Sequence, residues 1–235
     1  LNAKPDEIDK CVGVTIECCD KTSLLNDESL LRAVVGLLVD AHYQTRPSDL
    51  HALLNDPMQQ LWLARDNGRV VACAITIEEG GISKELAEQI ARGYRRPKGH
   101  LLLQSLAQHS TYAEGLEKKL WRIMRIATHE QCRRQGLASQ LAQAILKEAK
   151  QQSIDLLGTS YATDVTSLAF WQSQLFKSAR IGHRVDASSG AQSLQMLLAI
   201  SKSCIADVEQ LHAQYVKDLP YRLSDDLSAL EPAVV

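Results

Sequence analysis

A stretch of alternating apolar residues followed directly by a long amphipathic helix most constrains the fold of this 235-residue chain. Residues 119–128 (KLWRIMRIAT) alternate well enough for a buried strand. Residues 136–152 (GLASQLAQAILKEAKQQ) carry an apolar stripe along one face of a helix, formed by Leu137, Leu141, Ala144, Ile145 and Ala149. A strand that leads into such a helix is typical of a sheet with helices packed on it, so the chain is predicted to have an α/β fold.

A β-hairpin is the next clear feature. Residues 61–65 (LWLAR) and 69–79 (RVVACAITIEE) flank Asn67 and Gly68. Asn-Gly favours a tight hairpin turn because both residues tolerate positive φ. The sequence therefore predicts an antiparallel pair of strands here.

The remaining elements follow from hydrophobic spacing and from cap and turn residues. The further predicted strands are residues 11–18, 154–158, 175–183 and 191–200. The further predicted helices cover residues 28–41, 47–55, 83–91, 101–108 and 164–173, with one more helix from Ser201 onward. The pattern predicts one mixed, mostly antiparallel sheet flanked by helices, with a C-terminal helical extension outside the sheet-forming part.

Composition and missing motifs exclude several classes of protein. A content of 45% hydrophobic and 23% charged residues excludes wholesale disorder, and a net charge of -2 does not suit a strongly basic nucleic-acid binder. The sequence contains neither a GxxxxGK[ST] nor a GxGxxG motif, and its six cysteines form no C-x-x-C pair, so neither a nucleotide site nor a metal site is predicted. The first ten residues, LNAKPDEIDK, do not resemble a signal peptide, and no apolar run is long enough for a membrane span, so we expect a cytoplasmic protein.

The turn between the strand at 119–128 and its helix carries the most informative chemistry. Arg133 and Arg134 lead into Gly136, Leu137 and Ala138, where the helix begins. A helix start exposes unpaired N–H groups and the positive end of the helix dipole, so it suits a phosphate or pyrophosphate. The competing interpretation is an ordinary strand-to-helix turn with solvated arginines, and the turn alone does not decide between the two.

The pattern Arg133-x-x-Gly136-x-Ala138 after a strand resembles the Q/R-x-x-G-x-G/A pyrophosphate loop of the GNAT acetyltransferase superfamily, which binds acetyl-CoA. The order of predicted elements is also similar to that fold. The resemblance implies a GNAT domain over residues 23–200, preceded by an N-terminal strand or segment edge in residues 1–22. It implies that acetyl-CoA is bound by the following residues: Ile126, Ala127, Thr128, Arg133, Arg134, Gln135, Gly136, Leu137, Ala138 and Ser139.

Longer stretches resemble the bacterial tRNA(Met) cytidine acetyltransferases. They are Gly93 to His109 (GYRRPKGHLLLQSLAQH), residues 125–138 (RIATHEQCRRQGLA) and Gly182 to Gly190 (GHRVDASSG). Enzymes of this family join a helicase-like ATPase module, an acetyltransferase domain and a helical tail that grips tRNA. The resemblance implies acetyl transfer from acetyl-CoA to N4 of the wobble cytidine of elongator methionine tRNA. It also implies that ATP or GTP is hydrolysed by a module absent from this chain, and that residues 201–235 begin the tRNA-binding tail.

The sequence departs from the GNAT pattern at three positions. Many GNAT enzymes have a tyrosine that protonates the leaving thiolate where this chain has Trp171, and an indole cannot serve as that acid. Leu175 replaces a usual glycine, and Ala138 stands where many relatives have glycine. The thiolate acid therefore stays unassigned.

Acetylation of an exocyclic cytosine amine needs a general base or a water relay, because the amine loses a proton. The candidates are His129, Glu130, His100 and Asp164. His129 is favoured as the catalytic base because it directly follows the cofactor strand and an ordinary histidine pKa of ~6.5 suits proton transfer. A loop-stabilising histidine is the competing interpretation, and Asp164 is better explained as a helix N-cap. Since the sequence shows no catalytic triad, we expect direct transfer within a ternary complex.

A basic segment from Arg92 to His100 is the candidate tRNA contact, with Arg95, Arg96 and Lys98 predicted to bind phosphates. A solvated loop is the alternative, and the family resemblance favours the functional interpretation. Two other functions stay open: a GNAT enzyme that acetylates a protein or small-molecule amine, and a non-catalytic acetyl-CoA-binding domain. An alkyl ammonium substrate would call for an acidic groove, which the arginine-rich loop does not suggest.

Overall fold

The computed structural model describes residues 11–41, 46–187, 189–228 and 230. The first ten residues, in which no signal peptide was expected, and residues 231–235 lie outside this part of the chain. The described chain forms two compact units. Unit 1 comprises Leu1–Ile77 and Met124–Lys147, and unit 2 comprises Glu78–Ile123 and Glu148–Val235.

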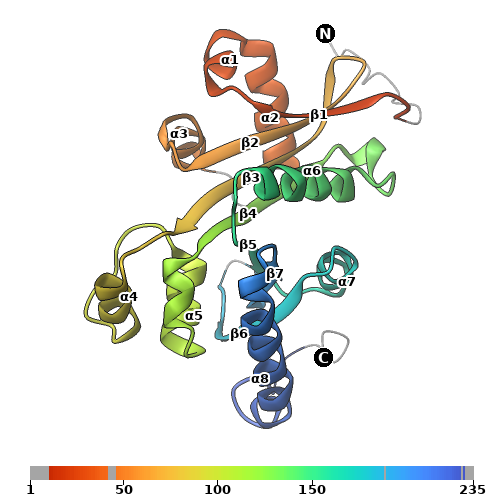
Figure 1. The fold of residues 1–235 in the computed structure, drawn as a ribbon. Helices are drawn as coiled ribbons and strands as arrows, with labels where there is room; N and C mark the ends of the chain where they lie inside the picture. Colours follow the sequence, from red (N-terminus) through yellow and green to blue (C-terminus); the bar gives the residue numbers. More distant parts are fainter. Residues whose placement is uncertain (1–10, 42–45, 188, 229, 231–235) are drawn as a thin grey trace. The chain divides into compact units, whose positions relative to one another are not determined.

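Strands and helices alternate along the chain as an α/β protein requires (Figure 1). The strands are β1 (Val14–Cys19), β2 (Gln59–Asp66), β3 (Arg69–Gly80), β4 (Lys119–Thr128), β5 (Leu156–Ala162), β6 (Lys177–Val185) and β7 (Gln192–Ala199). The helices are α1 (Lys21–Asn26), α2 (Glu28–Ala41), α3 (Pro47–Asn55), α4 (Lys84–Ala91), α5 (Leu101–His109), α6 (Leu137–Gln151), α7 (Val165–Ser173) and α8 (Ile205–Leu223). Short 3-10 turns are η1 (Ala113–Glu117), η2 (Glu130–Cys132) and η3 (Lys202–Cys204).

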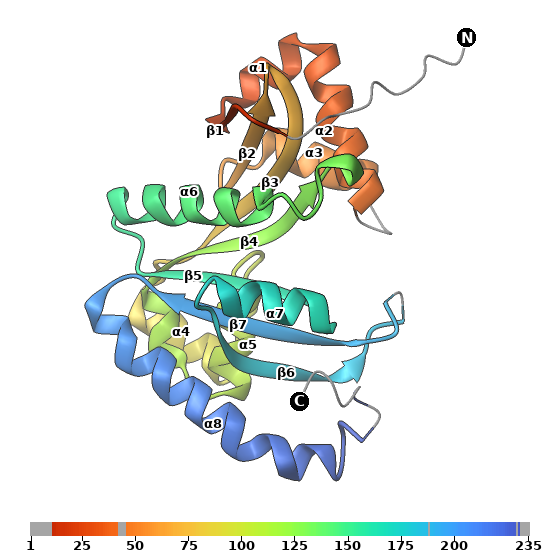
Figure 2. The same ribbon diagram turned by 90° about the vertical axis from the view of Figure 1, so that its right-hand side faces the viewer.

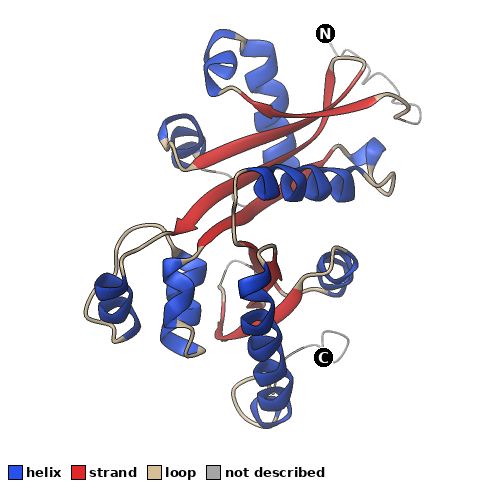
Figure 3. Ribbon diagram, in the orientation of Figure 1, coloured by secondary structure: helices blue, strands red, loops and turns tan. Residues whose placement is uncertain are grey.

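Within the described residues the strands form a seven-stranded sheet in the order β1-β2-β3-β4-β5-β7-β6. Strand β4 pairs with β5 in parallel, whereas the β1–β2, β2–β3, β5–β7 and β6–β7 pairs are antiparallel. The predicted fold class, a mixed and mostly antiparallel sheet with flanking helices, is confirmed (Figure 3). Over the described ranges, no helix combines the length and the apolar character that crossing a membrane requires.

The β2–β3 hairpin forms where Asn67 and Gly68 predict it, with φ values of 50° and 82°. In unit 1 its apolar side chains share a core with α1, α2 and α3. This core contains, among others, Leu24, Leu30, Val34, Leu53, Leu61, Leu63 and Ile75. Ala127 of β4 belongs to the same core, so the helices and the hairpin fix the strand that precedes the candidate cofactor turn.

In unit 2 a second core joins α4, α5 and η1 to β5, β6 and β7. Helix α8 confirms the predicted C-terminal helix, and it packs against β6 and β7 (Figure 2). Val208 and Leu211 of α8 are buried in this core. The helix that the sequence places outside the sheet-forming part is thus packed on the sheet of its own unit.

Helix α1 and the short turns η1 and η2 were not predicted, and some boundaries shift. Helix α1 begins after Asp20, whose carboxylate accepts the backbone N–H of Thr22 at 3.0 Å. A six-residue helix gives too short a pattern for its period to be recognised, and the same holds for η1. Strands β1 and β5 begin at Val14 and Leu156, a few residues later than expected.

Candidate functional site

The turn from β4 into α6 has an unusual backbone. Arg134 and Gly136 both have positive φ, at 64° and 80°. Helix α6 starts directly afterwards at Leu137, and the N–H of Gln140 donates to the carbonyl of Gly136 at 3.0 Å. The predicted sequence of strand, turn and helix is therefore present, with the end of β4, the turn and the start of α6 in unit 1 (Figure 3).

Open space and positive charge surround the start of α6. A Cβ added at Gly136 would meet only Nε2 of Gln140, at 4.0 Å. Arg133 and Arg134 are exposed beside it, and Leu137 turns its side chain into the protein. Because the first amides of a helix have no acceptor within the helix, the turn combines N–H donors, two guanidinium groups and room for an anion. These residues fit a pyrophosphate group.

The far side of the turn is fixed by contacts with Cys11. The backbone N–H of Cys11 donates to Oε1 of Gln135 at 2.9 Å, and Nε2 of Gln135 donates to the carbonyl of Gln131 at 3.2 Å. The side chain of Gln135, which was predicted to bind the cofactor, thus makes its hydrogen bonds within the protein. The Cys132 thiol lies 3.2 Å from that of Cys11, and burial is the main cause that raises the pKa of Cys132 to about 12.

The end of β4 presents the other predicted cofactor residues. Ala127 is buried in the core, while Ile126 and Thr128 are half-buried. The N–H of His129 donates to the carbonyl of Val71 at 2.9 Å, which fixes the backbone where β4 ends. The Nδ1 atom of His129 is buried and has no hydrogen-bond partner among the described residues.

The other candidate bases have different surroundings. Glu130 is exposed at the first position of η2. Asp164 accepts the backbone N–H of Ser167 at 2.8 Å, so the predicted N-cap of α7 is confirmed. Nδ1 of His100 accepts the backbone N–H of Gly80 at 2.8 Å, and His100 has a φ of 52°. His100 and Asp164 are therefore used to hold the backbone.

Two positions that depart from the GNAT pattern lie in α7 and shortly after it. Trp171 is buried, and its ring meets those of Phe170 and Phe176 edge-on, with centroid distances of 4.9 Å in both pairs. Leu175 has a φ of 66° and is 74% exposed, in the left-handed conformation that favours glycine. Leu175 therefore adopts a strained backbone conformation that a glycine would adopt without strain.

The basic segment belongs to unit 2. Arg92, Arg95, Arg96 and Lys98 all have exposed side chains. Nε2 of Gln104 donates to the carbonyls of Pro97 and Gly99, at 2.9 and 2.6 Å. The segment is therefore tied to α5 while its cations face solvent.

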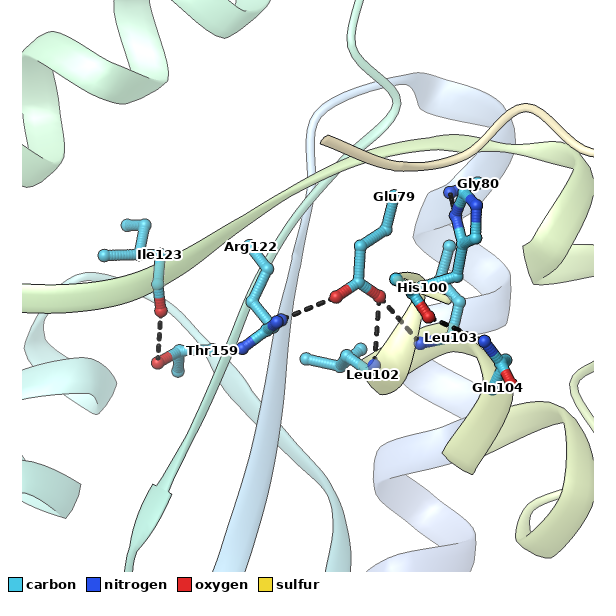
Figure 4. A network of polar contacts seen from close by, with 10 residues as sticks. Glu79, Gly80, His100, Leu102, Leu103, Gln104, Arg122, Ile123 and Thr159 are labelled. Atoms are coloured by element: carbon cyan, nitrogen blue, oxygen red, sulfur yellow. Dashed lines mark hydrogen bonds and ion pairs between the residues drawn. The ribbon is translucent and has the colours of Figure 1, made fainter. Parts of the chain in front are cut away.

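A buried ion pair that the sequence reasoning missed supports the same segment (Figure 4). Glu79 is 0% exposed, and its Oε1 lies 2.6 Å from Nε of Arg122. Its Oε2 accepts the N–H groups of Leu102 and Leu103 at 3.0 and 3.2 Å, which caps the start of α5. The signal in the sequence was a glutamate and an arginine, each next to apolar residues of a strand that carries other polar residues as well.

Comparison with known proteins shows a family match. Residues 33–147 match the family model GNAT acetyltransferase 2. The chain is 40% identical over 219 residues, 93% of its length, to the tRNA(Met) cytidine acetyltransferase TmcA of Nitrosococcus halophilus, of which it covers 29%. It is 37% identical over 205 residues, 87% of its length, to the enzyme of that name from Vibrio cholerae, of which it covers 28%. The chain thus spans less than a third of the length of these curated relatives.

Solved structures share the fold at low sequence identity. The apo form of an agmatine N-acetyltransferase mutant superimposes with a TM-score of 0.57 at 14% identity, covering 80% of this chain and 100% of that one. A GNAT family acetyltransferase from Elizabethkingia anophelis with acetyl-CoA bound gives a TM-score of 0.50 at 13% identity, covering 80% of this chain and 98% of that one.

Proposed function

Since the chain belongs to the GNAT acetyltransferases by its fold and by the match of residues 33–147, we propose that it transfers the acetyl group of acetyl-CoA to N4 of the wobble cytidine of elongator methionine tRNA. Similarity to tRNA(Met) cytidine acetyltransferases over 93% of the chain supports this substrate. In the proposal the chain is the acetyltransferase portion of a larger, cytoplasmic, ATP-dependent enzyme.

The turn at Gly136 is the observation that carries the proposal. Its positive φ, its open surroundings and the start of α6 suit the pyrophosphate of acetyl-CoA, with Arg133 and Arg134 adding charge. The backbone of Leu137, Ala138 and Ser139 would donate to the pyrophosphate oxygens. Strand β4 at Ile126–Thr128 would hold the pantetheine arm through main-chain hydrogen bonds.

Acetyl-CoA supplies an activated thioester, and the residues of the chain would orient it and move protons. In the transfer, a bond forms between N4 of cytidine and the acetyl carbon, and the carbon–sulfur bond breaks. A backbone N–H near Ile126 would stabilise the oxygen anion that develops on the carbonyl. His129, whose Nδ1 is buried without a described partner, would accept the proton that N4 loses, and the leaving thiolate takes up a proton from an acid that stays unassigned.

Arg95, Arg96 and Lys98 are proposed to bind tRNA phosphates. Their side chains are exposed on a segment that Gln104 and the Glu79–Arg122 pair hold in shape. An ordered backbone supports this role because fewer degrees of freedom are lost on binding. Residues from Ser201 onward are proposed to begin the tRNA-binding tail, and the relatives' uncovered length would include the ATPase module that hydrolyses ATP or GTP.

Calorimetry with acetyl-CoA, followed by a single-turnover assay on methionine tRNA, tests the proposal. We expect saturable binding of acetyl-CoA and acetylation of a tRNA with cytidine at the wobble position. A matched tRNA with uridine at that position should not react, since it lacks the exocyclic amine. Efficient acetylation of a peptide lysine would favour a GNAT enzyme acting on proteins, and binding without transfer to either substrate would favour a non-catalytic domain.

A further inference from the structure

A small cavity lies inside unit 1 beneath α2 and α3. Its volume is about 100 Å³. Its walls are mostly apolar and include Leu38, Leu53, Ile75 and Met124. A slot of this size fits a single pyrimidine ring, and a whole nucleotide would not enter it.

Gln59 of β2 supplies a polar side chain to this cavity. The residue is only 7% exposed, its side-chain amide makes no hydrogen bond to a described residue, and the amide nitrogen and oxygen are not among the fully buried unpaired atoms of the described chain. The amide offers a donor and an acceptor to a ring bound in the cavity.

An ion pair borders the same cavity. Nη2 of Arg125 lies 2.7 Å from Oδ2 of Asp49, and their side chains are 19% and 38% exposed. Oδ2 of Asp49 also accepts the backbone N–H of Arg46 at 3.1 Å. The cavity therefore offers a carboxylate acceptor beside the amide of Gln59.

The position of the cavity along β4 connects it to the proposed reaction. Met124 and Arg125 line it, and they directly precede Ile126, where the acetyl carbonyl is proposed to bind. All these residues belong to unit 1. A ring in the cavity would thus lie next to the strand segment that holds the thioester.

We infer that this cavity binds the cytosine ring of the acceptor nucleotide, with Gln59 and Asp49 as its specificity-determining contacts. The inference rests on the proposed function, which supplies cytidine as the acceptor. Carboxylates accept hydrogen bonds from N4 of cytosine, and the N–H of an amide can donate to N3 or O2. Enzymes that modify a base remove it from the stack and hold it between apolar side chains while reading its Watson–Crick edge. Uracil would direct O4 at the Asp49 carboxylate, so it is excluded by repulsion.

Saturation-transfer NMR with cytidine 5′-monophosphate tests the cavity without any acetyl transfer. We expect transfer to the H5 and H6 protons of the cytosine ring in the wild type, and a markedly weaker signal with uridine 5′-monophosphate. Gln59→Leu is expected to weaken cytidine monophosphate binding about tenfold, the effect of losing ~1.4 kcal/mol. Gln60→Leu is the matched control, because Gln60 is the next residue of β2 and its side chain points to the opposite face.

Thermal unfolding and acetyl-CoA calorimetry on the same variants separate the different kinds of failure. Gln59→Leu should unfold at the wild-type temperature or above, since it places an apolar side chain against the mostly apolar walls of the cavity, and should still bind acetyl-CoA. Equal signals for the two nucleotides, or no change in Gln59→Leu, would overturn the inference. A wild-type chain that binds cytidine monophosphate but not acetyl-CoA would support the base site while contradicting the proposed function. Asp49→Asn provides a second test. Since an amide can donate a hydrogen bond to O4 of uracil, the binding preference should shift from cytidine monophosphate towards uridine monophosphate.

Discussion

Few residues other than glycine could adopt the backbone conformation of Gly136 at the start of α6. Its φ of 80° belongs to the left-handed region, and the space beside it is open. We expect Gly136→Glu to abolish acetyl-CoA binding in calorimetry, because it places a negative charge where the pyrophosphate is proposed to bind. Gly136→Asn is the control, since asparagine tolerates positive φ and carries no charge, and it should keep part of the affinity. Unchanged affinity in the glutamate variant would show that the turn does not bind the cofactor.

A substitution of His129 is expected to affect the rate of acetyl transfer and not the affinity for acetyl-CoA. We expect His129→Ala to leave acetyl-CoA affinity unchanged and to lower the single-turnover rate of transfer to tRNA by ~10²-fold or more, the usual contribution of a general base. His51→Ala is the control, because His51 is an exposed histidine of α3 in the same unit. If both variants react at the wild-type rate, His129 only stabilises its loop.

Helix α7 ends in a conformation that its sequence does not favour. Leu175 adopts a φ of 66°, and the N–H of Phe176 donates to the carbonyl of Trp171 at 3.1 Å to close the helix. Left-handed backbone costs a non-glycine residue roughly 1–2 kcal/mol, so Leu175→Gly is expected to raise the free energy of unfolding by about 1 kcal/mol, after the added entropy of the unfolded chain. Urea unfolding measures this, and Leu175→Ala should bring no gain because it keeps the strained φ.

The start of α5 depends on one carboxylate. Glu79→Ala leaves Arg122 buried without its partner and removes the acceptor of two helix N–H groups, so we expect a loss of roughly 3–5 kcal/mol in the free energy of unfolding. The double variant Glu79→Leu with Arg122→Leu removes both charges and should recover much of that loss. If the double variant is as unstable as the single one, capping of α5 rather than charge pairing dominates.

Elements with a strong local signal were predictable from the sequence. The Asn67-Gly68 hairpin and the α6 stripe fall where turn chemistry and helical period require them. Helix α1 was not predicted because six residues are too few to show the hydrophobic period of a helix. The Glu79–Arg122 pair was not predicted because its partners are 43 residues apart, and only the sheet brings them together. The cavity at Gln59 was likewise invisible, since its walls come from α2, α3 and three strands.

The chain as a whole is expected to bind acetyl-CoA but to bind tRNA only weakly. It corresponds to 28–29% of the length of its tRNA(Met) cytidine acetyltransferase relatives. Arg95, Arg96 and Lys98 offer few phosphate contacts, and such contacts weaken steeply with salt. We therefore expect the chain to fold, to bind acetyl-CoA, to bind tRNA weakly and to acetylate it slowly, with no effect of ATP.

Filter binding across a salt series and tRNA acetylation with and without ATP check this expectation. Supplying the parts of the relatives that this chain does not cover should raise the acetylation rate and make it respond to ATP. Robust, ATP-independent acetylation of methionine tRNA by this chain at physiological salt would contradict the proposed division of labour.

The division of each unit into two chain segments has a consequence for biosynthesis. The chain passes between the units inside β3, β4 and α6, at residues 77–78, 123–124 and 147–148. The core of unit 1 includes Ala127, so its early helices and hairpin cannot be completed until residues far along the chain, in β4, have been translated. Meanwhile the edge of β3 stays unpaired and apolar, a state prone to aggregation. We therefore expect a nascent chain of this protein to be prone to aggregation until β4 has left the ribosome.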